Sequence, residues 1–206
     1  MKNLFFGLAS IILFISACAA ETKVQQGRMA MLYSDPNAAI GSFQSAAELA
    51  PDRLYFSVFP QGSWTYVGRA YYMAGRYPEA RQALERATSL HKDDNMAKLY
   101  FGLTSARSGD RQSGLKEIED GLRGLHEWLD YVNQYAASSY GQYWDPTNEI
   151  RSEIKNSLAM ISGKEIDGEK LIASGEWVGR KMEEEIDIAR GQESRDRSRR
   201  DESSAN

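Results

Sequence analysis

One set of small and apolar residues recurs along this chain at a fixed interval, and it constrains the fold more than any other feature. The clearest copy consists of Trp64, Val67, Gly68, Tyr71, Gly75, Ala80, Leu84 and Ala87. A step of 34 residues places Lys98, Phe101, Gly102, Ser105, Gly109, Gly114, Ile118 and Gly121 in the same slots. Spacings of three and four residues put side chains on one face of a helix, so each copy predicts a pair of packed helices.

A third copy lies upstream, displaced by one period plus an insert of seven residues. Its members are Gly27, Ala30, Ala39, Phe43, Ala46 and Pro51. Its second helix fits the pattern closely, but its first helix fits less well because Lys23 and Gln26 occupy apolar slots. The insert from Leu54 to Pro60 is interpreted as apolar packing at an irregular joint rather than as a lid.

These spacings resemble the tetratricopeptide repeat, a helix–turn–helix unit of about 34 residues with the pattern W-x2-L-G-x2-Y, then A-x3-F and a later Pro. Here Val67 and Leu84 are conservative replacements, and Lys92 occupies the proline slot. The resemblance implies repeats at 20-53, 61-94 and 95-128 within an array at 18-128. Three repeats are the minimum at which stacked neighbours bury a continuous core. We therefore predict an all-α fold, a short right-handed solenoid of about three helix pairs with C-terminal capping helices.

Apolar periodicity continues beyond the repeats. A stripe from Leu115 to Ala136 predicts that the second helix of the last repeat runs on as one long helix. Gly114, Gly121 and Gly124 should each weaken this helix by up to about 1 kcal/mol. We therefore expect these glycines to allow close packing against a neighbouring helix.

The segment 129-190 is predicted to form the capping helices. Asp145 and Pro146 combine a favourable N-cap with proline at the first helical position, so one helix is expected to begin there. Residues 191-206 contain no apolar side chain except Ala205 and predict a disordered tail. A group of aromatic residues is either core of this cap, which we favour, or a partner-binding patch: Trp128, Tyr131, Tyr135, Tyr140, Tyr143 and Trp144.

Residues 1-17 predict a signal peptide, in which Lys2 precedes an apolar run too short for a stable membrane helix. The segment Ile15-Ser16-Ala17-Cys18 resembles the bacterial lipobox, which implies that Cys18 is lipidated and becomes the mature N-terminus. Ala19 after the cysteine, rather than Asp, resembles sorting to the outer membrane. The alternative is cleavage after Ala19, which would release a soluble periplasmic protein.

The charge balance argues against nucleic acid as a partner. The chain has 25 basic and 29 acidic side chains, and cleavage before Cys18 would remove only Lys2, leaving 24 against 29 and a net charge of −5. Nucleic-acid binding depends on clustered positive charge that neutralises phosphates.

The sequence contains no motif of an enzyme or a cofactor site. His91 and His126 lie 35 residues apart and lack metal-ligand spacing. No H-E-x-x-H, G-x-S-x-G or Walker sequence occurs, and the only cysteine is Cys18. The glutamates at 183–185 are consecutive, so they point in different directions, and we interpret them as part of a solvated helix face. We therefore predict no enzyme, no metal and no cofactor.

The family resemblance implies a binding groove lined by the first helix of each repeat. Carrying over the usual groove slots gives Thr65, Arg69, Tyr72, Met73, Leu99, Leu103 and Arg107 as the peptide-binding residues. Arg69 and Arg107 could each pair with a carboxylate through two hydrogen bonds, so the groove suits an apolar peptide with an acidic group. The Lys and Asn residues of the family's chaperone-tail clamp are missing, so that activity is not transferred.

Together these features predict a lipid-anchored, periplasm-facing protein-binding scaffold at the outer membrane, an adaptor in cell-envelope assembly. Its partners would be envelope proteins held in the groove, and the N-terminal lipid would hold it to the membrane. A structural or pilotin-like subunit of a secretion or type IV pilus system is the second hypothesis, and an envelope hydrolase is the third.

Overall fold

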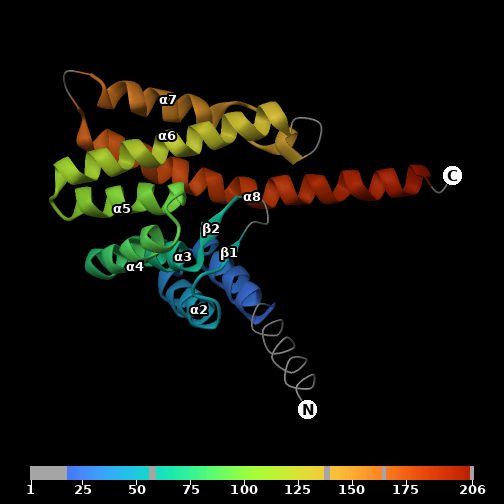
Figure 1. Cartoon of the computed structure of the whole chain (residues 1–206), viewed down its shortest axis with the longest axis horizontal. Helices are drawn as coiled ribbons and strands as arrows, with labels where there is room; N and C mark the ends of the chain where they lie inside the picture. The colour runs from blue at the N-terminus through green and yellow to red at the C-terminus, as the bar shows by residue number, and fades with distance from the viewer. Residues whose placement is uncertain (1–17, 56–58, 137–139, 164–165, 205–206) are drawn as a thin grey trace, which may run out of the picture.

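The computed structural model describes residues 18–55, 59–136, 140–163 and 166–204. Its architecture is all-α, as the sequence predicts (Figure 1). An N-terminal helix covers residues 18–32. It is followed by α2 Pro36–Leu49, α3 Ser63–Met73, α4 Tyr77–Leu90, α5 Asn95–Arg107, α6 Arg111–Tyr135, α7 Glu149–Ile161 and α8 Gly168–Ser204. A short 3-10 helix, η1 Tyr140–Tyr143, lies between α6 and α7.

The N-terminal helix, α3 and α5 are the first helices of the three predicted repeats, and α2, α4 and α6 are their second helices. The turn within each repeat requires a positive φ at one slot of the pattern. Gly75 and Gly109 fill this slot with φ of 71° and 95°, and Ser34 fills it in the first repeat with φ of 58°. Glycine adopts this conformation without steric cost, which explains its recurrence one period apart.

Each repeat pairs a glycine on its first helix with a large apolar residue on its second helix. A Cβ added to Gly68 would lie 2.7 Å from Cδ2 of Leu84, and one added to Gly27 would lie 2.6 Å from the ring of Phe43. The third pair is Gly102 with Ile118. The same contact in three places confirms the predicted register and shows why small residues recur there.

The glycines of α6 serve the close packing that the sequence predicts. A Cβ on Gly121 would lie 2.7 Å from Cα of Leu99 on α5, and one on Gly114 would lie 2.8 Å from the backbone nitrogen of Ala106. α6 also runs on as one helix from Arg111 to Tyr135, as expected.

The insert between the first two repeats packs against the body. β1 Leu54–Tyr55 and β2 Gln61–Gly62 pair as a two-residue antiparallel ladder, an element the sequence did not predict. Phe59 is buried, and its ring centroid lies 4.8 Å from that of Trp128. This part of the insert therefore agrees with the packing interpretation, whereas residues 56–58 lie outside the described residues.

The C-terminal region differs from the sequence prediction in two ways. α7 begins at Glu149, not directly after Asp145, because Asp145 and Asn148 both have positive φ and cannot continue a helix. The Asp145 carboxylate still accepts a hydrogen bond from the backbone nitrogen of Ile150 at 2.9 Å. The predicted disordered tail instead continues α8 through Ser204, with an ion pair of 2.9 Å between Arg197 and Glu193 one turn apart.

The predicted aromatic group is divided between core and surface. Trp144 is fully buried, whereas Tyr131 and Tyr135 are 58% and 69% exposed.

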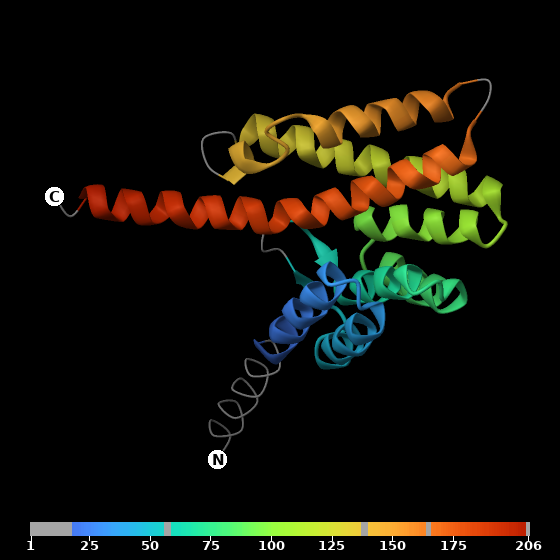
Figure 2. The same ribbon diagram turned by 180° about the vertical axis from the view of Figure 1, so that it is seen from behind.

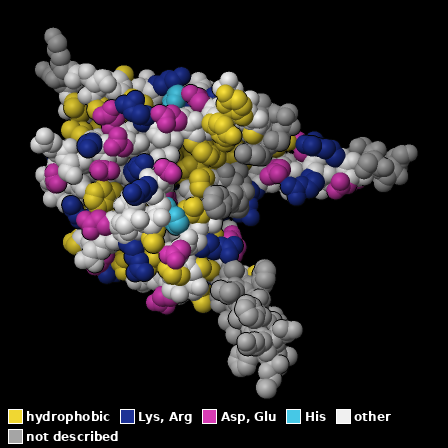
Figure 3. Space-filling model, viewed as in Figure 1, with side chains coloured by type: hydrophobic (Ala, Val, Ile, Leu, Met, Phe, Trp, Pro, Cys, Tyr) yellow, Lys and Arg dark blue, Asp and Glu magenta, His cyan; other side chains and the backbone are white. Residues whose placement is uncertain are grey.

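In the view of Figure 3, acidic and basic side chains alternate over the face rather than forming one large area of a single charge. Within the residues that the structure describes, no helix has both the length and the apolar character that a membrane span requires.

We predict that Gly121→Ala lowers the free energy of unfolding by about 1–3 kcal/mol, because the added methyl group forces α5 and α6 apart. Gly41→Ala is the matched control. It lies inside α2 with no atom within 4 Å of its added Cβ, so it should stabilise the protein by up to about 1 kcal/mol. Urea unfolding followed by circular dichroism measures both values, and equal shifts of the two variants would contradict the packing account.

Candidate functional site

The first helices of the three repeats form one face of the array, which we call the first-helix face. Helix α8 packs on this face: in Figure 2 it crosses in front of α6, runs beside α5 and then continues beyond the body. Polar contacts join α8 to each first helix, through Arg28 of the N-terminal helix, Arg69 of α3 and Arg107 of α5. The predicted peptide groove is therefore covered over much of its length by the chain's own last helix.

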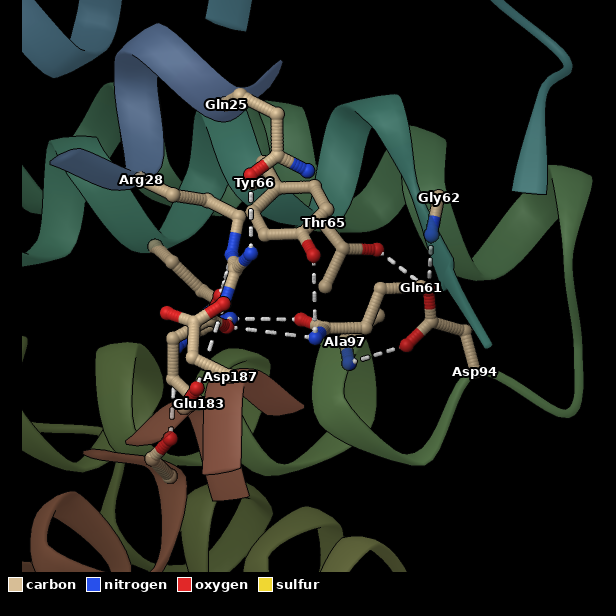
Figure 4. A network of polar contacts seen from close by, with 12 residues as sticks. Gln25, Arg28, Gln61, Gly62, Thr65, Tyr66, Asp94, Ala97, Glu183 and Asp187 are labelled. Atoms are coloured by element: carbon tan, nitrogen blue, oxygen red, sulfur yellow. Dashed lines mark hydrogen bonds and ion pairs between the residues drawn. The ribbon is translucent and has the colours of Figure 1, made fainter. Parts of the chain in front are cut away.

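Glu183 of α8 lies at the centre of a buried polar network (Figure 4). Its Oε2 accepts a hydrogen bond from Nη1 of Arg69 at 2.5 Å, and its Oε1 accepts one from Nε of Arg28. Nη1 of Arg69 also donates to Oε1 of Gln61 at 2.6 Å. Nη2 of Arg28 lies 3.1 Å from Oδ1 of Asp187, one turn along α8. The two positive charges of the arginines are thus balanced by the two negative charges of the carboxylates.

Both arginines of this network are almost inaccessible, with Arg28 4% and Arg69 1% exposed. Burial by itself would raise the pKa of Glu183, but the attraction of Arg69 and Arg28 outweighs it and lowers this pKa below its ordinary value. Burial acts to lower the pKa of Arg69, and the charge of Glu183 outweighs it and raises the pKa. These shifts favour the ionised forms of Glu183 and Arg69.

Two further glutamates of α8 contact the same face. Oε1 of Glu176 accepts hydrogen bonds from Oη of Tyr72 at 2.5 Å and from Nη2 of Arg107 at 3.1 Å. Nη1 of Arg107 donates to Oε2 of Glu169 at 3.1 Å. These contacts extend the polar attachment of α8 along α3 and α5.

Glycines let α8 approach α5 closely between these contacts. A Cβ added to Gly175 would lie 3.0 Å from Cδ2 of Leu103, and one added to Gly179 would lie 2.7 Å from the ring of Tyr100. Leu99 and Leu103 are fully buried. The aliphatic part of the predicted groove is therefore core in the folded chain.

The structure also gives Thr65 an internal partner. Its hydroxyl donates to Oδ2 of Asp94 at 2.5 Å, and the same oxygen accepts from the backbone nitrogen of Gly62 at 2.8 Å. Oδ1 of Asp94 caps α5 by accepting from the nitrogen of Ala97. Burial outweighs these hydrogen bonds and raises the pKa of Asp94. Thr65 therefore links α3 to the residue that caps the N-terminus of α5.

A cleft of about 710 Å³ stays open beside α8, on the side of the N-terminal helix and α3. Four of the predicted groove residues line it: Arg69, Tyr72, Met73 and Arg107. Met73 is 44% exposed and the Arg107 side chain is 32% exposed. Met73 and Arg107 are therefore the part of the predicted groove that a partner can reach, whereas Tyr72 is buried, and peptide binding there stays a prediction.

Sequence reasoning missed the residues that complete this cleft. Met31 and Leu32 come from the N-terminal helix, where the repeat pattern is weak, and Trp177 and Arg180 come from α8. It also placed Glu183 on a solvated face, which is wrong because α8 turns this residue toward two buried arginines. The available signal was the seven-residue spacing of Glu169, Glu176 and Glu183, which marks one face of a helix.

Across the described ranges, no group of three His, Cys, Asp or Glu side chains is arranged to hold a metal ion.

We predict that Glu183→Gln lowers the free energy of unfolding by about 3–5 kcal/mol, because it leaves buried arginine charge without its carboxylate. The neighbouring Glu184→Gln is the control. Glu184 pairs with Arg180 and Lys181 at the surface, so its loss should cost less than about 1 kcal/mol. Denaturant unfolding followed by tryptophan fluorescence measures both, and similar losses in the two variants would refute the central role of Glu183.

The lowered pKa of Glu183 also predicts a pH dependence. A carboxylate whose pKa is depressed in the folded state contributes stability above its unfolded pKa of about 4.3, and this contribution is lost as pH falls through the folded value. The difference in unfolding free energy between wild type and Glu183→Gln should therefore shrink as the pH is lowered from neutral to about 3. Denaturant titrations at stepped pH measure it, and a constant difference would show that the charge of Glu183 is not involved.

Comparison with known proteins agrees with the repeat register. Residues 62–94, which include α3 and α4, match the family model of the tetratricopeptide repeat. No curated protein sequence matches the chain. Repeats of this family typically form non-catalytic surfaces for contact between proteins. The chain therefore contains a tetratricopeptide repeat, within an array of helix pairs suited to protein–protein recognition.

Proposed function

We propose that this chain is a protein-binding scaffold, held by a lipid on Cys18 at the periplasmic face of the bacterial outer membrane, where it acts as an adaptor in cell-envelope assembly. The observation that carries the binding part is the open cleft on the first-helix face, where apolar side chains remain accessible.

The chemistry of the cleft suits an apolar segment of a partner protein. Leu32 is 51% exposed and Met73 is 44% exposed, and Trp177 of α8 also lines the cleft. Methionine side chains adapt to differently shaped partners, and tryptophan is enriched among residues that dominate binding energy. Arg107 and Arg180 at the cleft add hydrogen-bond donors for an acidic group.

The membrane part of the proposal rests on Cys18. This residue is a free, exposed cysteine in the N-terminal helix, and it is the last residue of the lipobox-like segment. Each acyl methylene buried in a bilayer contributes about 0.8 kcal/mol, so several chains on one cysteine give stable anchoring.

The N-terminal helix connects the proposed anchor to the cleft. Cys18 is the first described residue of this helix, and Met31 and Leu32 at its other end line the cleft. A helix rises 1.5 Å per residue, so the two sites lie about 20 Å apart along its axis. An anchored molecule would therefore present the cleft near the membrane surface, where envelope proteins can reach it.

The test is crosslinking in living cells, followed by detergent extraction, pull-down and mass spectrometry. We expect Met73→Glu to reduce capture of specific envelope partners by roughly 30-fold, because a charge in the apolar cleft costs about 2 kcal/mol of binding. Leu49→Glu is the matched control, since Leu49 is 41% exposed on α2 and does not line the cleft. Cys18→Ala should move the protein from the membrane fraction to the soluble fraction.

The outcomes separate the parts of the proposal. Equal capture by the Met73→Glu and Leu49→Glu variants would contradict binding at the cleft. A membrane-bound Cys18→Ala variant would contradict lipid anchoring. A partner recovered in a fixed ratio after extraction would identify a structural subunit of a larger machine instead of an adaptor.

A further inference from the structure

The attachment of α8 has a regular pattern that goes beyond a simple cap. Glu169, Glu176 and Glu183 are spaced seven residues apart, close to two helical turns, so they lie on one stripe of α8. This stripe meets three arginines, one from the first helix of each repeat: Arg107 of α5, Arg69 of α3 and Arg28 of the N-terminal helix.

Small residues complete the pattern. Gly175 and Gly179 stand between the glutamates, and a larger side chain at either position would collide with Leu103 or Tyr100 of α5. The first-helix face therefore holds a helix by two features: carboxylates at seven-residue spacing, and small residues that allow close approach of the backbone.

From this geometry we infer that α8 is a built-in ligand of the first-helix face, and that the face also takes a partner helix with the same pattern, which displaces α8. This inference rests on the proposed scaffold function and names the partner class: an amphipathic helix with glutamates at i, i+7 and i+14 and glycines between them.

The energetics of the contact between α8 and the first-helix face allow a partner helix to replace α8. Buried ion pairs lose in desolvation much of what they gain in attraction, so they act more through specificity than through net stability. A competing helix with the same carboxylates neutralises Arg28, Arg69 and Arg107 again, so no buried cation is left unpaired. The opposite side of α8 packs on α7, with Ser174 bonded to Ser157, and this contact holds α8 on α7 during exchange.

The test uses the full chain with Cys18→Ala, Ser108→Cys and Lys170→Cys, the exposed neighbours of the ion-paired Arg107 and Glu169, so that a long bifunctional maleimide can bridge the ends of α5 and α8. The probe is a fluorescent designed peptide of three heptads, alanine-rich, with glutamates seven residues apart and glycines at the positions of Gly175 and Gly179. The control peptide has glutamine in place of each glutamate. Circular dichroism before and after bridging verifies that the helices are intact.

We expect the glutamate peptide to bind the unbridged protein at least tenfold more tightly than it binds the bridged protein. We also expect it to bind the unbridged protein at least tenfold more tightly than the glutamine peptide does. Equal binding before and after bridging would overturn the inference, because α8 would not need to move. Absence of binding to the unbridged protein would overturn it as well.

A second comparison separates this inference from the proposed function. The bridged protein is presented to a cell-envelope extract beside the Met73→Glu variant. If Met73→Glu loses its partners while bridging changes nothing, the cleft is the binding site and the displacement of α8 is wrong. If bridging alone abolishes capture, the displacement stands and the open cleft is not the site. If neither the bridged protein nor the Met73→Glu variant loses partners, then both binding at the cleft and the displacement of α8 are wrong.

Discussion

Glu183 joins Arg28 and Arg69 inside the protein, and the placement of α8 depends on this contact. An arginine does not lose its proton in a protein, so two arginines that are 4% and 1% exposed require a carboxylate beside them. Only one register of α8 brings Glu183 to both. That register then sets Glu176 against Tyr72 and brings Gly175 and Gly179 onto α5.

This contact changes where recognition can occur. Tetratricopeptide helix pairs normally leave their first helices open to a ligand, but here α8 covers part of that face and forms one wall of the remaining cleft. The cleft therefore combines residues of the N-terminal helix, α3, α5 and α8. The shape and chemistry of the cleft therefore depend on α8 as well as on the repeats.

The sequence predicts the repeats well because their determinants are local. Gly68 and Leu84 lie 16 residues apart, and the same pair of slots recurs at a fixed period, so the contact can be recognised without a structure. The turn glycines, Gly75 and Gly109, are equally visible because each is needed for one backbone conformation.

The position of α8 could not be predicted in the same way. Glu183 pairs with residues 155 and 114 positions away in the chain, and within its run of three glutamates it has the composition of a solvated helix face. The helical end of α8 beyond residue 191 was also missed, because polar composition alone predicts disorder while pairs such as Arg197 with Glu193 favour a helix. Periodicity identifies a helix face but does not identify the surface that it meets.

Native-state hydrogen exchange of the wild-type chain, followed by mass spectrometry, tests the central claim that α8 is held on the first-helix face. The account predicts that amides of residues 171–189 exchange as slowly as those of α3 and α5, whereas residues 197–204 at the exposed end of the same helix exchange quickly. Fast exchange along the whole of α8, with α3 and α5 still protected, would contradict the account and show that the first-helix face is open in solution.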